Sequence, residues 1–313
     1  MIKLFTHTDL DGVGCAILAQ LAFGKDNVDI SYCNYDDIDQ IILDYVLKNF
    51  DDVSTTIYIT DISTNEEIAD LLNKRGNVRL FDHHATSLYL NKYNWCTVSV
   101  DEPDGTKTSG VMMFYQWLML NDNYNKKLKT NKSLYNFVDL VRNYDTWRWK
   151  ELGEDGVICK QVNDLLYLYG RDGFINWCIS EIHDEVFPRL YGKDKFVLQV
   201  RQSEIDKYIE EKNKTMIINV NGLCGKVCGF VFADRFVSEL GNRLCEMNPG
   251  IDFVAIINID NRTVSYRTIK ENINLGEDVA ALFGGGGHSK AAGSQFTDKI
   301  KRNVIKNIFG INI

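Results

Sequence analysis

Strand-like and helix-like segments alternate through the first part of the chain, from Ile2 to Phe81. Short runs of apolar and β-branched residues are typical of strands, and the segments between them repeat apolar residues at helical spacing. A β-α-β series of this kind folds into a parallel sheet covered by helices. The predicted strands are Ile2–Phe5, Val28–Tyr32, Thr56–Ile59 and Val78–Phe81, and the predicted helices are Cys15–Phe23, Ile38–Phe50 and Glu66–Lys74.

A second, smaller α/β unit is predicted toward the C-terminus. At 313 residues the chain is longer than one hydrophobic core usually holds, so we expect two domains. The highly charged segment 193–214 has helical character and few apolar anchors, and strand patterns return after it. We therefore expect a larger domain over residues 1–192, a connecting helix over 193–214 and a smaller domain over 215–313. Its predicted elements are the strands Met216–Val220, Val227–Val231, Phe253–Ile259 and Thr263–Arg267, with a helix over Arg235–Met247.

The net charge and the composition of the chain limit which kinds of molecule it can bind. The formal net charge of −8 argues against long duplex DNA, because wrapping a duplex needs a broad basic surface. A small anionic substrate remains compatible with this charge if cations are present at its site. The apolar start of the chain is too short for a signal peptide, no run has the length of a transmembrane helix, and the 8 cysteines are scattered. We expect a cytoplasmic protein with reduced thiols and no membrane partner.

Polar side chains that can bind metal follow three of the predicted strands. Alternate residues of an extended segment point the same way, so an imidazole and two carboxylates can converge after the first strand. Gly12 then permits a tight turn into the next helix. Three of the 5 histidines of the chain lie in these segments. The segments are His7-Thr8-Asp9-Leu10-Asp11-Gly12, then Asp61, then Asp82-His83-His84.

Each of these residues alone has a simpler explanation. Asp61 stands before Ser63 and Glu66 and could cap the next helix. A lone histidine such as His7 is more often a satisfied core or surface residue. Their coincidence favours a site, because neighbouring carboxylates repel one another unless cations neutralise them. Mixed imidazole and carboxylate ligands suit manganese, iron or zinc.

These segments resemble the first three motifs of the DHH phosphoesterases. Asp145 fits the position of the single aspartate of the fourth motif. Residues 284–293, with the sequence GGGGHSKAAG, look like the signature of the DHHA1 substrate-binding domain, although a glycine-rich stretch can also be a flexible turn. Adjacent glycines leave backbone N–H groups free for an oxyanion, and small residues let a helix begin nearby. Arg267 occupies the place of the phosphate-contacting arginine of that domain.

The resemblance, which extends from His7 to Gly293, implies an α/β fold with an N-terminal parallel-sheet DHH domain and a smaller α/β DHHA1 domain. It also implies two divalent metal ions, with Mn²⁺ as the expected ion, and a water activated between them. His7 and Asp9 would hold one ion, Asp11 and His83 the other, Asp61 would bridge them and Asp145 would complete the cluster. Two catalytic residues would support them: His84 would contact the scissile phosphate, and Asp82 would orient the histidines. A second phosphate or the nucleotide end would bind to Arg267, Gly285, Gly286, Gly287 and His288.

The motif order is most similar to the nanoRNase, or oligoribonuclease, branch of the family. This branch implies a phosphodiesterase that hydrolyses short RNA or DNA oligonucleotides between its two domains. Alternatives that stay open are cleavage of cyclic or linear dinucleotides and of adenosine 3′,5′-bisphosphate. A nucleotide sensor without activity is disfavoured, because all the expected ligands are present. A homodimer is compatible with the sequence, and family II pyrophosphatases are disfavoured because they lack the glycine-histidine signature.

Overall fold

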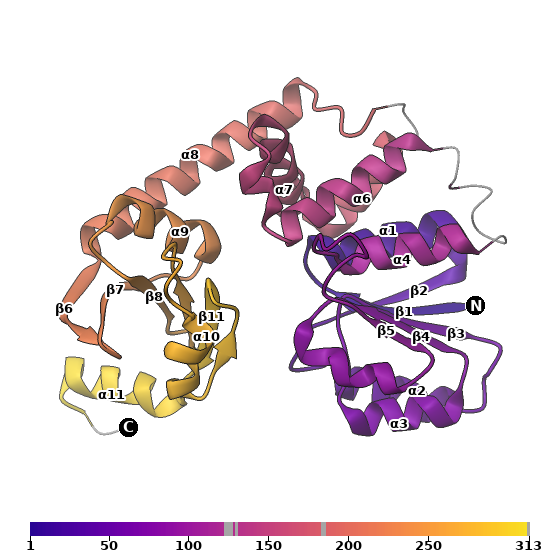
Figure 1. Cartoon of the computed structure of the whole chain (residues 1–313), viewed down its shortest axis with the longest axis horizontal. Coiled ribbons are helices and arrows are strands. Elements are labelled where there is room, and N and C mark those ends of the chain that lie inside the picture. Colours follow the sequence, from indigo (N-terminus) through magenta and orange to yellow (C-terminus); the bar gives the residue numbers. More distant parts are fainter. Residues whose placement is uncertain (122–127, 129–130, 183–185, 312–313) are drawn as a thin grey trace. The chain divides into compact units, whose positions relative to one another are not determined.

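The computed structural model describes residues 1–121, 128, 131–182 and 186–311, and they divide into two compact units, Met1–Leu198 and Gln199–Ile313 (Figure 1). The helix α8 (Gly192–Thr215) runs through the segment predicted to connect the domains, and the division between the units falls inside it. None of the described helices combines the length and apolar content needed to cross a lipid bilayer.

The first unit is built on a five-stranded sheet in the order β2-β1-β3-β4-β5. All of its neighbouring strands are parallel, which confirms the predicted parallel sheet. The sequence pattern missed β5, because three residues are too few to show an alternation. The strands are β1 (Ile2–His7), β2 (Val28–Cys33), β3 (Thr56–Thr60), β4 (Val78–Asp82) and β5 (Cys96–Val98).

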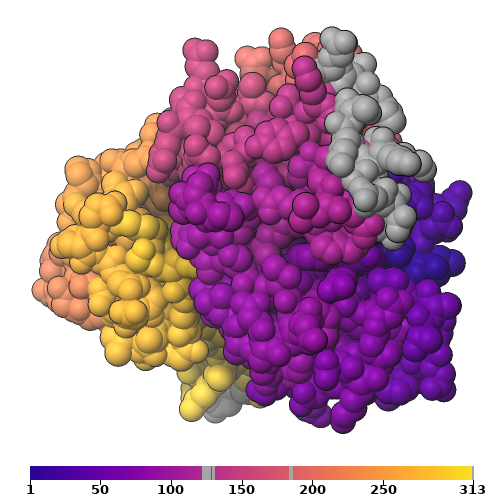
Figure 2. Space-filling view, turned by 45° about the vertical axis from the view of Figure 1, so that its right-hand side comes forward, coloured from indigo at the N-terminus to yellow at the C-terminus, as the bar shows by residue number. Residues whose placement is uncertain are grey.

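Helices cover both faces of this sheet because successive strand residues point to opposite sides. α1 and α4 cover one face of the sheet, and α2 and α3 cover the other (Figure 1). Leu4 and Tyr58 pack into the core on the first face, whereas Phe5 and Ile59 pack into the core on the second. Figure 2 shows one face of the molecule with all its atoms drawn. The helices are α1 (Leu10–Phe23), α2 (Ile38–Asn49), α3 (Glu66–Arg75), α4 (Gly110–Leu120), α6 (Lys132–Asp145) and α7 (Glu154–Glu181), with short 3-10 turns η1 (Lys25–Asn27), η2 (Ala85–Lys92) and η3 (Arg148–Glu151).

The helix α7 was not predicted, and its sequence explains why. Gly170 inside it has φ 66° and ψ 165°, which is not helical, so α7 consists of two shorter helices joined by a kink. The backbone break interrupts the apolar spacing on which a prediction depends. α6 and α7 nevertheless complete the core on the α1 face, through residues such as Phe137 and Phe174.

The second unit contains a six-stranded sheet in the order β10-β11-β9-β8-β7-β6, which confirms a second α/β unit. Only β7 and β8 are parallel, and the remaining neighbours are antiparallel. The C-terminal half of α8 and helix α9 contribute to the core on one face, and α10 and η4 to the core on the other. The elements are β6 (Ile217–Leu223), β7 (Lys226–Phe232), α9 (Val237–Met247), β8 (Phe253–Asn258), β9 (Thr263–Arg267), α10 (Leu275–Asp278), η4 (Ala280–Phe283), β10 (Gly286–Gly287), β11 (Ala291–Gln295) and α11 (Asp298–Phe309).

The glycine-rich stretch has a different local structure from the one expected. Its small residues would allow a helix to begin nearby, but the stretch forms β10 and turns back into β11 as an antiparallel hairpin. The glycines permit a close backbone approach. A Cβ at Gly285 would lie 2.0 Å from the carbonyl oxygen of Gly293, and one at Gly287 would lie 2.6 Å from Cα of Ala292.

In the first unit, Gly12 likewise permits a close backbone approach, where the chain turns from β1 into α1. A Cβ on Gly12 would lie 2.2 Å from the carbonyl oxygen of His7, a backbone atom that cannot rotate away. We predict that Gly12→Ala lowers the free energy of unfolding by about 1–3 kcal/mol, the usual range for overpacking. Urea denaturation measures this change.

Gly173→Ala is the matched control for the Gly12 variant. A Cβ there would lie 3.4 Å from Cβ of Tyr169, an ordinary contact, within a helix that alanine favours. This control is expected to leave the protein as stable as wild type or more stable. Equal stability losses in both variants would show that the close approach at Gly12 does not constrain the turn.

Candidate active site

Three neighbouring parallel strands, β1, β3 and β4, end at one edge of the first sheet, and an imidazole or carboxylate side chain that could bind a metal ion lies at or just after the end of each. The edge lies at the carboxyl ends of the strands, where sheets of this kind bind ligands. The six predicted ligands meet there, although they come from separate parts of the chain. They are His7, Asp9, Asp11, Asp61, His83 and Asp145.

His7 and Asp9 lie on the two sides of the turn into α1. The ring Nδ1 of His7 lies 2.9 Å from Oδ2 of Asp9. Asp9 is also the N-cap of α1, and its Oδ1 accepts a hydrogen bond of 3.1 Å from the backbone N–H of Gly12. One carboxylate therefore fixes the helix start with one oxygen and faces His7 with the other.

Asp11 is buried and is held by a helix almost a hundred residues away. Its Oδ2 and Oδ1 accept hydrogen bonds from the backbone N–H groups of Gly110 and Val111, at 2.6 and 2.9 Å, where α4 begins. The positive end of the helix dipole stabilises a carboxylate at this position. Gly110 also allows the close approach, since a Cβ there would lie 2.5 Å from Cβ of Asp61. No pattern in the sequence indicates this pairing, because it depends on where α4 packs.

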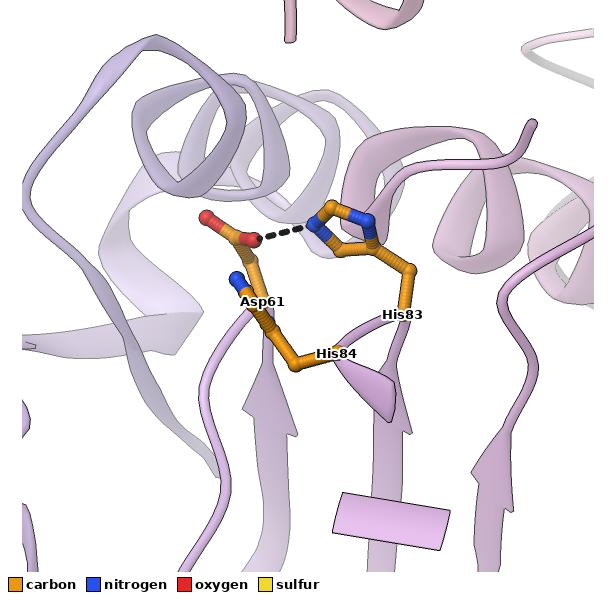
Figure 3. Close-up of side chains that lie close together, drawn as sticks. All are labelled: Asp61, His83 and His84. Atoms are coloured by element: carbon orange, nitrogen blue, oxygen red, sulfur yellow. Dashed lines mark hydrogen bonds and ion pairs between the residues drawn. The ribbon is translucent and has the colours of Figure 1, made fainter. Parts of the chain in front are cut away.

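Asp61 lies at the centre of the cluster. Its φ of 58° is in the left-handed region, which aspartate adopts more readily than most residues, and its backbone N–H donates to the carbonyl of Phe81. Its Oδ1 lies 3.2 Å from Nε2 of His83 (Figure 3). Its Oδ2 lies 3.8 Å from Nδ1 of His7. Asp61 does not cap the next helix, because Asn65 caps α3. The capping alternative for Asp61 is therefore wrong.

His83 joins Asp61 to two further carboxylates. Its Nε2 lies 3.5 Å from Oδ2 of Asp145, at the end of α6, and 3.7 Å from Oδ2 of Asp11. Ligand atoms of three groups of side chains lie within 4.8 Å of one another, as a metal ion requires. The groups are His7, Asp9 and Asp61; Asp11, His83 and Asp145; and Asp61, His83 and His84.

Burial and mutual repulsion perturb these carboxyls strongly. Burial raises the pKa of Asp61 well above its usual value, and the nearby carboxylates of Asp11 and Asp9 raise it further. The pKa of Asp145 is raised for the same two reasons. Burial would also raise the pKa of Asp9, but His7 and the N–H of Gly12 outweigh it and lower the pKa to about 2. The cluster is thus an unfavourable concentration of negative charge that a cation would relieve.

Asp82 is fully buried beneath the two histidines and holds them. Its Oδ1 accepts a hydrogen bond from the backbone N–H of His83 at 2.8 Å and lies 2.7 Å from Nδ1 of His84, while Oδ2 accepts from the hydroxyl of Ser63. Burial raises its pKa, but the bond to and charge of His84 and the Ser63 hydroxyl prevail and lower it to about 2. Asp82 is therefore an ionised carboxylate that fixes the orientation of His84.

His84 has a partner that the sequence did not reveal. Its Nε2 lies 2.9 Å from the hydroxyl of Tyr35, a residue in the loop after β2. The ring of Tyr35 also lies beside His7, with ring centroids 5.0 Å apart. Tyr35 follows a strand end like the other members of the site, but a single tyrosine in a loop is too common a feature to predict a role.

The predicted substrate-binding residues lie in the second unit. Arg267 is half-buried: it donates to the carbonyl of Tyr266 at 2.8 Å and to the hydroxyl of Ser238 at 3.2 Å, and burial lowers its pKa. His288 is exposed at the end of β10, and Gly286 is exposed with open space around it. The arrangement places a guanidinium and an imidazole on the same sheet, since β9 and β10 are both neighbours of β11.

Comparison with known proteins decides the family. No family model matches the chain. Oligoribonuclease NrnB of Bacillus subtilis (strain 168) is 36% identical over 321 residues, and the match covers 100% of this chain and 77% of that protein. The chain belongs to the DHH/DHHA1 phosphoesterase family. This relationship confirms the predicted resemblance to the oligoribonuclease branch and the prediction of a phosphodiester hydrolase.

Solved DHH-type structures share the fold. The pGpG-specific phosphodiesterase PggH from Vibrio cholerae matches with a TM-score of 0.52 at 15% identity, over 99% of each chain. RecJ of Thermus thermophilus, solved in complex with Mn²⁺, matches with a TM-score of 0.60 at 13% identity, over 96% of this chain and 50% of that one. At these identities the likeness shows the fold alone.

Because the carboxylates of the cluster repel one another, we expect the negative charge of Asp61 to destabilise the metal-free protein. Asp61→Asn keeps the shape and suits the left-handed backbone, but it removes one of the crowded charges. We predict that it raises the Tm of the metal-free protein by roughly 2–4 °C, equivalent to about 1 kcal/mol for a domain of this size. Differential scanning calorimetry in a chelating buffer measures the shift.

The exposed carboxylate of Asp26 provides the control for charge alone. Asp26→Asn is expected to leave the Tm within about 1 °C of wild type, because exposed charges contribute little to stability. A lower Tm for Asp61→Asn than for Asp26→Asn would contradict a repulsive cluster.

Proposed function

We propose that this DHH/DHHA1 chain is a divalent-cation-dependent phosphodiesterase that hydrolyses short oligonucleotides. One observation carries the proposal. Six imidazole and carboxylate side chains converge at the strand ends of a chain that is 36% identical, over its whole length, to an oligoribonuclease. Mixed ligands of this kind suit transition-metal ions such as Mn²⁺.

The donor atoms fit divalent cations. Oδ2 of Asp61 is buried and has no hydrogen-bond partner among the residues that the structure describes, so it is available as a ligand. Burial lowers the pKa of His83, although the charge of Asp11 opposes it, and this favours the neutral imidazole that a metal ion binds. The crowding of Asp61 with Asp11 and Asp145 leaves negative charge that cations would neutralise.

Two of the three groups of side chains share Asp61 or lie next to it, and each could hold one ion. We propose that His7 and Asp9 hold one ion, that Asp11, His83 and Asp145 hold the other, and that Asp61 bridges them. A pair of such ions supplies an activated water and stabilises the charge that develops on the phosphate oxygens. The chain itself orients two of these carboxylates. Asp9 is held because it caps α1, and Asp11 is held because it accepts hydrogen bonds from the first N–H groups of α4.

His84 is proposed to contact the scissile phosphate. The ionised carboxylate of Asp82 accepts from Nδ1 of His84, so this ring nitrogen carries a proton and Nε2 faces the cluster side, where Tyr35 lies. Nε2 can donate to a phosphate oxygen when the ring is protonated; burial opposes protonation, but the hydrogen bond to and charge of Asp82 prevail and raise the pKa of His84. A phosphate oxygen and the Tyr35 hydroxyl, as an acceptor, would then share this ring atom. Asp82 acts through His84 and is a positioning residue for it.

The second unit is proposed to bind a further phosphate or the end of the nucleotide. Arg267 and His288 supply a cation and an imidazole, and the backbone of Gly285, Gly286 and Gly287 supplies N–H groups. The terminal nitrogens of Arg267 are oriented by the carbonyl of Tyr266 and the hydroxyl of Ser238. The proposed phosphate contacts require a substrate larger than one phosphate ester. A homodimer and a cytoplasmic location remain predictions.

Removal of metal is predicted to abolish activity reversibly. The protein treated with excess EDTA should not hydrolyse a 5′-phosphorylated dinucleotide, and Mn²⁺ should restore the rate better than Mg²⁺ or Ca²⁺. Because the pKa values of Asp61 and Asp145 are raised, protons compete with the ions, so the Mn²⁺ concentration needed should increase as the pH falls. Bound metal is counted by mass spectrometry with two ions expected per chain. Full activity in excess EDTA would contradict the proposal.

The same assay separates the substrates that the sequence left open. Dinucleotides, five-residue oligonucleotides, cyclic dinucleotides and adenosine 3′,5′-bisphosphate are compared by kcat/KM with Mn²⁺. The proposed function requires the linear dinucleotide or the short oligonucleotide to have the largest value. A preference for the cyclic dinucleotide or the bisphosphate would assign the chain to one of the alternative activities.

Loss of the second-unit contacts is predicted to affect long substrates more than short ones. His288 is exposed, so His288→Ala should fold normally. It should lower kcat/KM on a pentanucleotide by about 10-fold or more, as expected for a charge-assisted contact of roughly 1.5–3 kcal/mol. Hydrolysis of a nitrophenyl phosphodiester should change little, because that ester has no second phosphate.

An exposed lysine on α11 provides the control for charge in the second unit. Lys306→Ala should leave both substrates unaffected, and neither variant should lose bound metal. If His288→Ala lost the same factor on both substrates, the residue would have a role other than holding the far part of the nucleotide.

A further inference from the structure

Tyr35 combines a large exposed surface with a fixed position beside the metal-binding cluster. The residue is 60% exposed, which is unusual for a tyrosine whose hydroxyl and ring both have partners. Its hydroxyl lies 2.9 Å from Nε2 of His84, and its ring centroid lies 5.0 Å from that of His7 and 5.7 Å from that of His84. The proposed metal and phosphate contacts use His7 and His84, but they leave this aromatic surface without a role.

The loop that carries Tyr35 is fixed by hydrogen bonds on both sides of the residue. The carboxylate of Asp37 accepts from the backbone N–H of Asn34 at 2.6 Å, and the carbonyl of Asn34 accepts from the N–H of Asp37 and of Ile38. The side chain of Asn34 accepts from the hydroxyl of Thr8, which stands between His7 and Asp9. The ring is therefore held relative to the first motif, so little conformational entropy is lost when a ligand packs on it.

A short oligonucleotide presents a flat aromatic surface close to each of its phosphates. If a phosphate lies between the cluster and His84, a base of the same nucleotide lies one sugar away, and Tyr35 borders both histidines. Aromatic side chains bind bases of any sequence by stacking, because every base has a π face. The carboxylates of the cluster cannot stack on a base. Among the described residues, Tyr35 is the exposed aromatic side chain that contacts both His7 and His84.

We propose that Tyr35 is a nucleobase-stacking subsite, on which a base next to the scissile phosphate packs while the hydroxyl anchors the ring to His84. This inference rests on the proposed function, since it takes the substrate to be a short oligonucleotide. It assigns Tyr35 a binding role that is independent of base identity. Stacking forms in the bound substrate and persists in the transition state, so it lowers KM and leaves kcat nearly unchanged.

Two substitutions separate the ring from the hydroxyl. Tyr35→Leu removes both, and Tyr35→Phe removes the bond to His84 and keeps the ring. On a 5′-phosphorylated diadenylate with Mn²⁺, Tyr35→Leu should raise KM by about 10-fold or more with kcat within about 3-fold, the range expected for one lost stacking contact. Tyr35→Phe should have a KM within about 3-fold of wild type, because the stacking surface remains.

A dinucleotide without bases tests the ligand directly. On a diphosphate backbone of the same length in which both bases are replaced by hydrogen, wild type and Tyr35→Leu should have the same KM. The matched control is Tyr167→Leu, which removes an equally exposed tyrosine, 61% exposed, from α7 and should change neither substrate. All variants should bind the same amount of metal as wild type.

Three results would overturn the subsite. Equal increases in KM on the diadenylate and on the base-free dinucleotide would show that the ring does not bind a base. A loss of kcat in Tyr35→Phe as large as in Tyr35→Leu would show that the hydroxyl acts through His84. Unchanged kinetics in Tyr35→Leu would show that the ring is not used.

Failure of the proposed function would give a different result. Wild-type protein would then hydrolyse no dinucleotide, and the subsite would be judged by binding of a non-hydrolysable phosphorothioate dinucleotide that contains 2-aminopurine. Stacking on Tyr35 should quench the fluorescence of the bound base in wild type and in Tyr35→Phe, and less in Tyr35→Leu. Equal quenching in the three proteins would overturn the subsite on its own.

Discussion

The repulsion among buried carboxylates at one sheet edge is the constraint on which the rest of the site depends. Asp11, Asp61 and Asp145 lie close around His83, and removing them from water raises the pKa of Asp61 and Asp145. A fold keeps such a cluster only if rigid elements hold each member in place. The metal-free protein is thereby kept in a state that divalent cations stabilise, so binding and stability are linked.

The fold supplies these rigid elements from segments that are distant in sequence. The first N–H groups of α4 hold Asp11, the backbone at the end of β3 holds Asp61 in a left-handed conformation, and α1 begins on Asp9. Beneath them, Asp82 fixes His84, and Tyr35 contacts the outer side of that ring. The site thus has a charged layer for cations and phosphate and a neighbouring aromatic surface, which together match the two chemical parts of a nucleotide.

In the second unit, the glycine-rich stretch packs its backbone closely against β11. Gly285 and Gly287 lie against β11 at distances that exclude a side chain, and the backbone of Gly287 is nevertheless exposed, as are Gly286 and His288. The close backbone approach is therefore a structural reason for Gly285 and Gly287 that is separate from any ligand. Arg267 is partly buried by its contacts with Tyr266 and Ser238, which restricts the directions from which a phosphate can reach it.

The sequence by itself determined the alternation of strands and helices, the second α/β unit and the six side chains proposed as metal ligands, because these depend on local spacing and on which residues follow a strand. It did not identify α7, whose kink at Gly170 breaks the helical spacing, or the β10–β11 hairpin, whose two-residue strand is too short for a pattern. Only the tertiary structure decided that α4 holds Asp11, that Asn65 and not Asp61 caps α3, and that Tyr35 meets His84. These contacts join residues separated by up to a hundred positions, and their partners are selected by the packing of whole elements, which no local pattern of residues records.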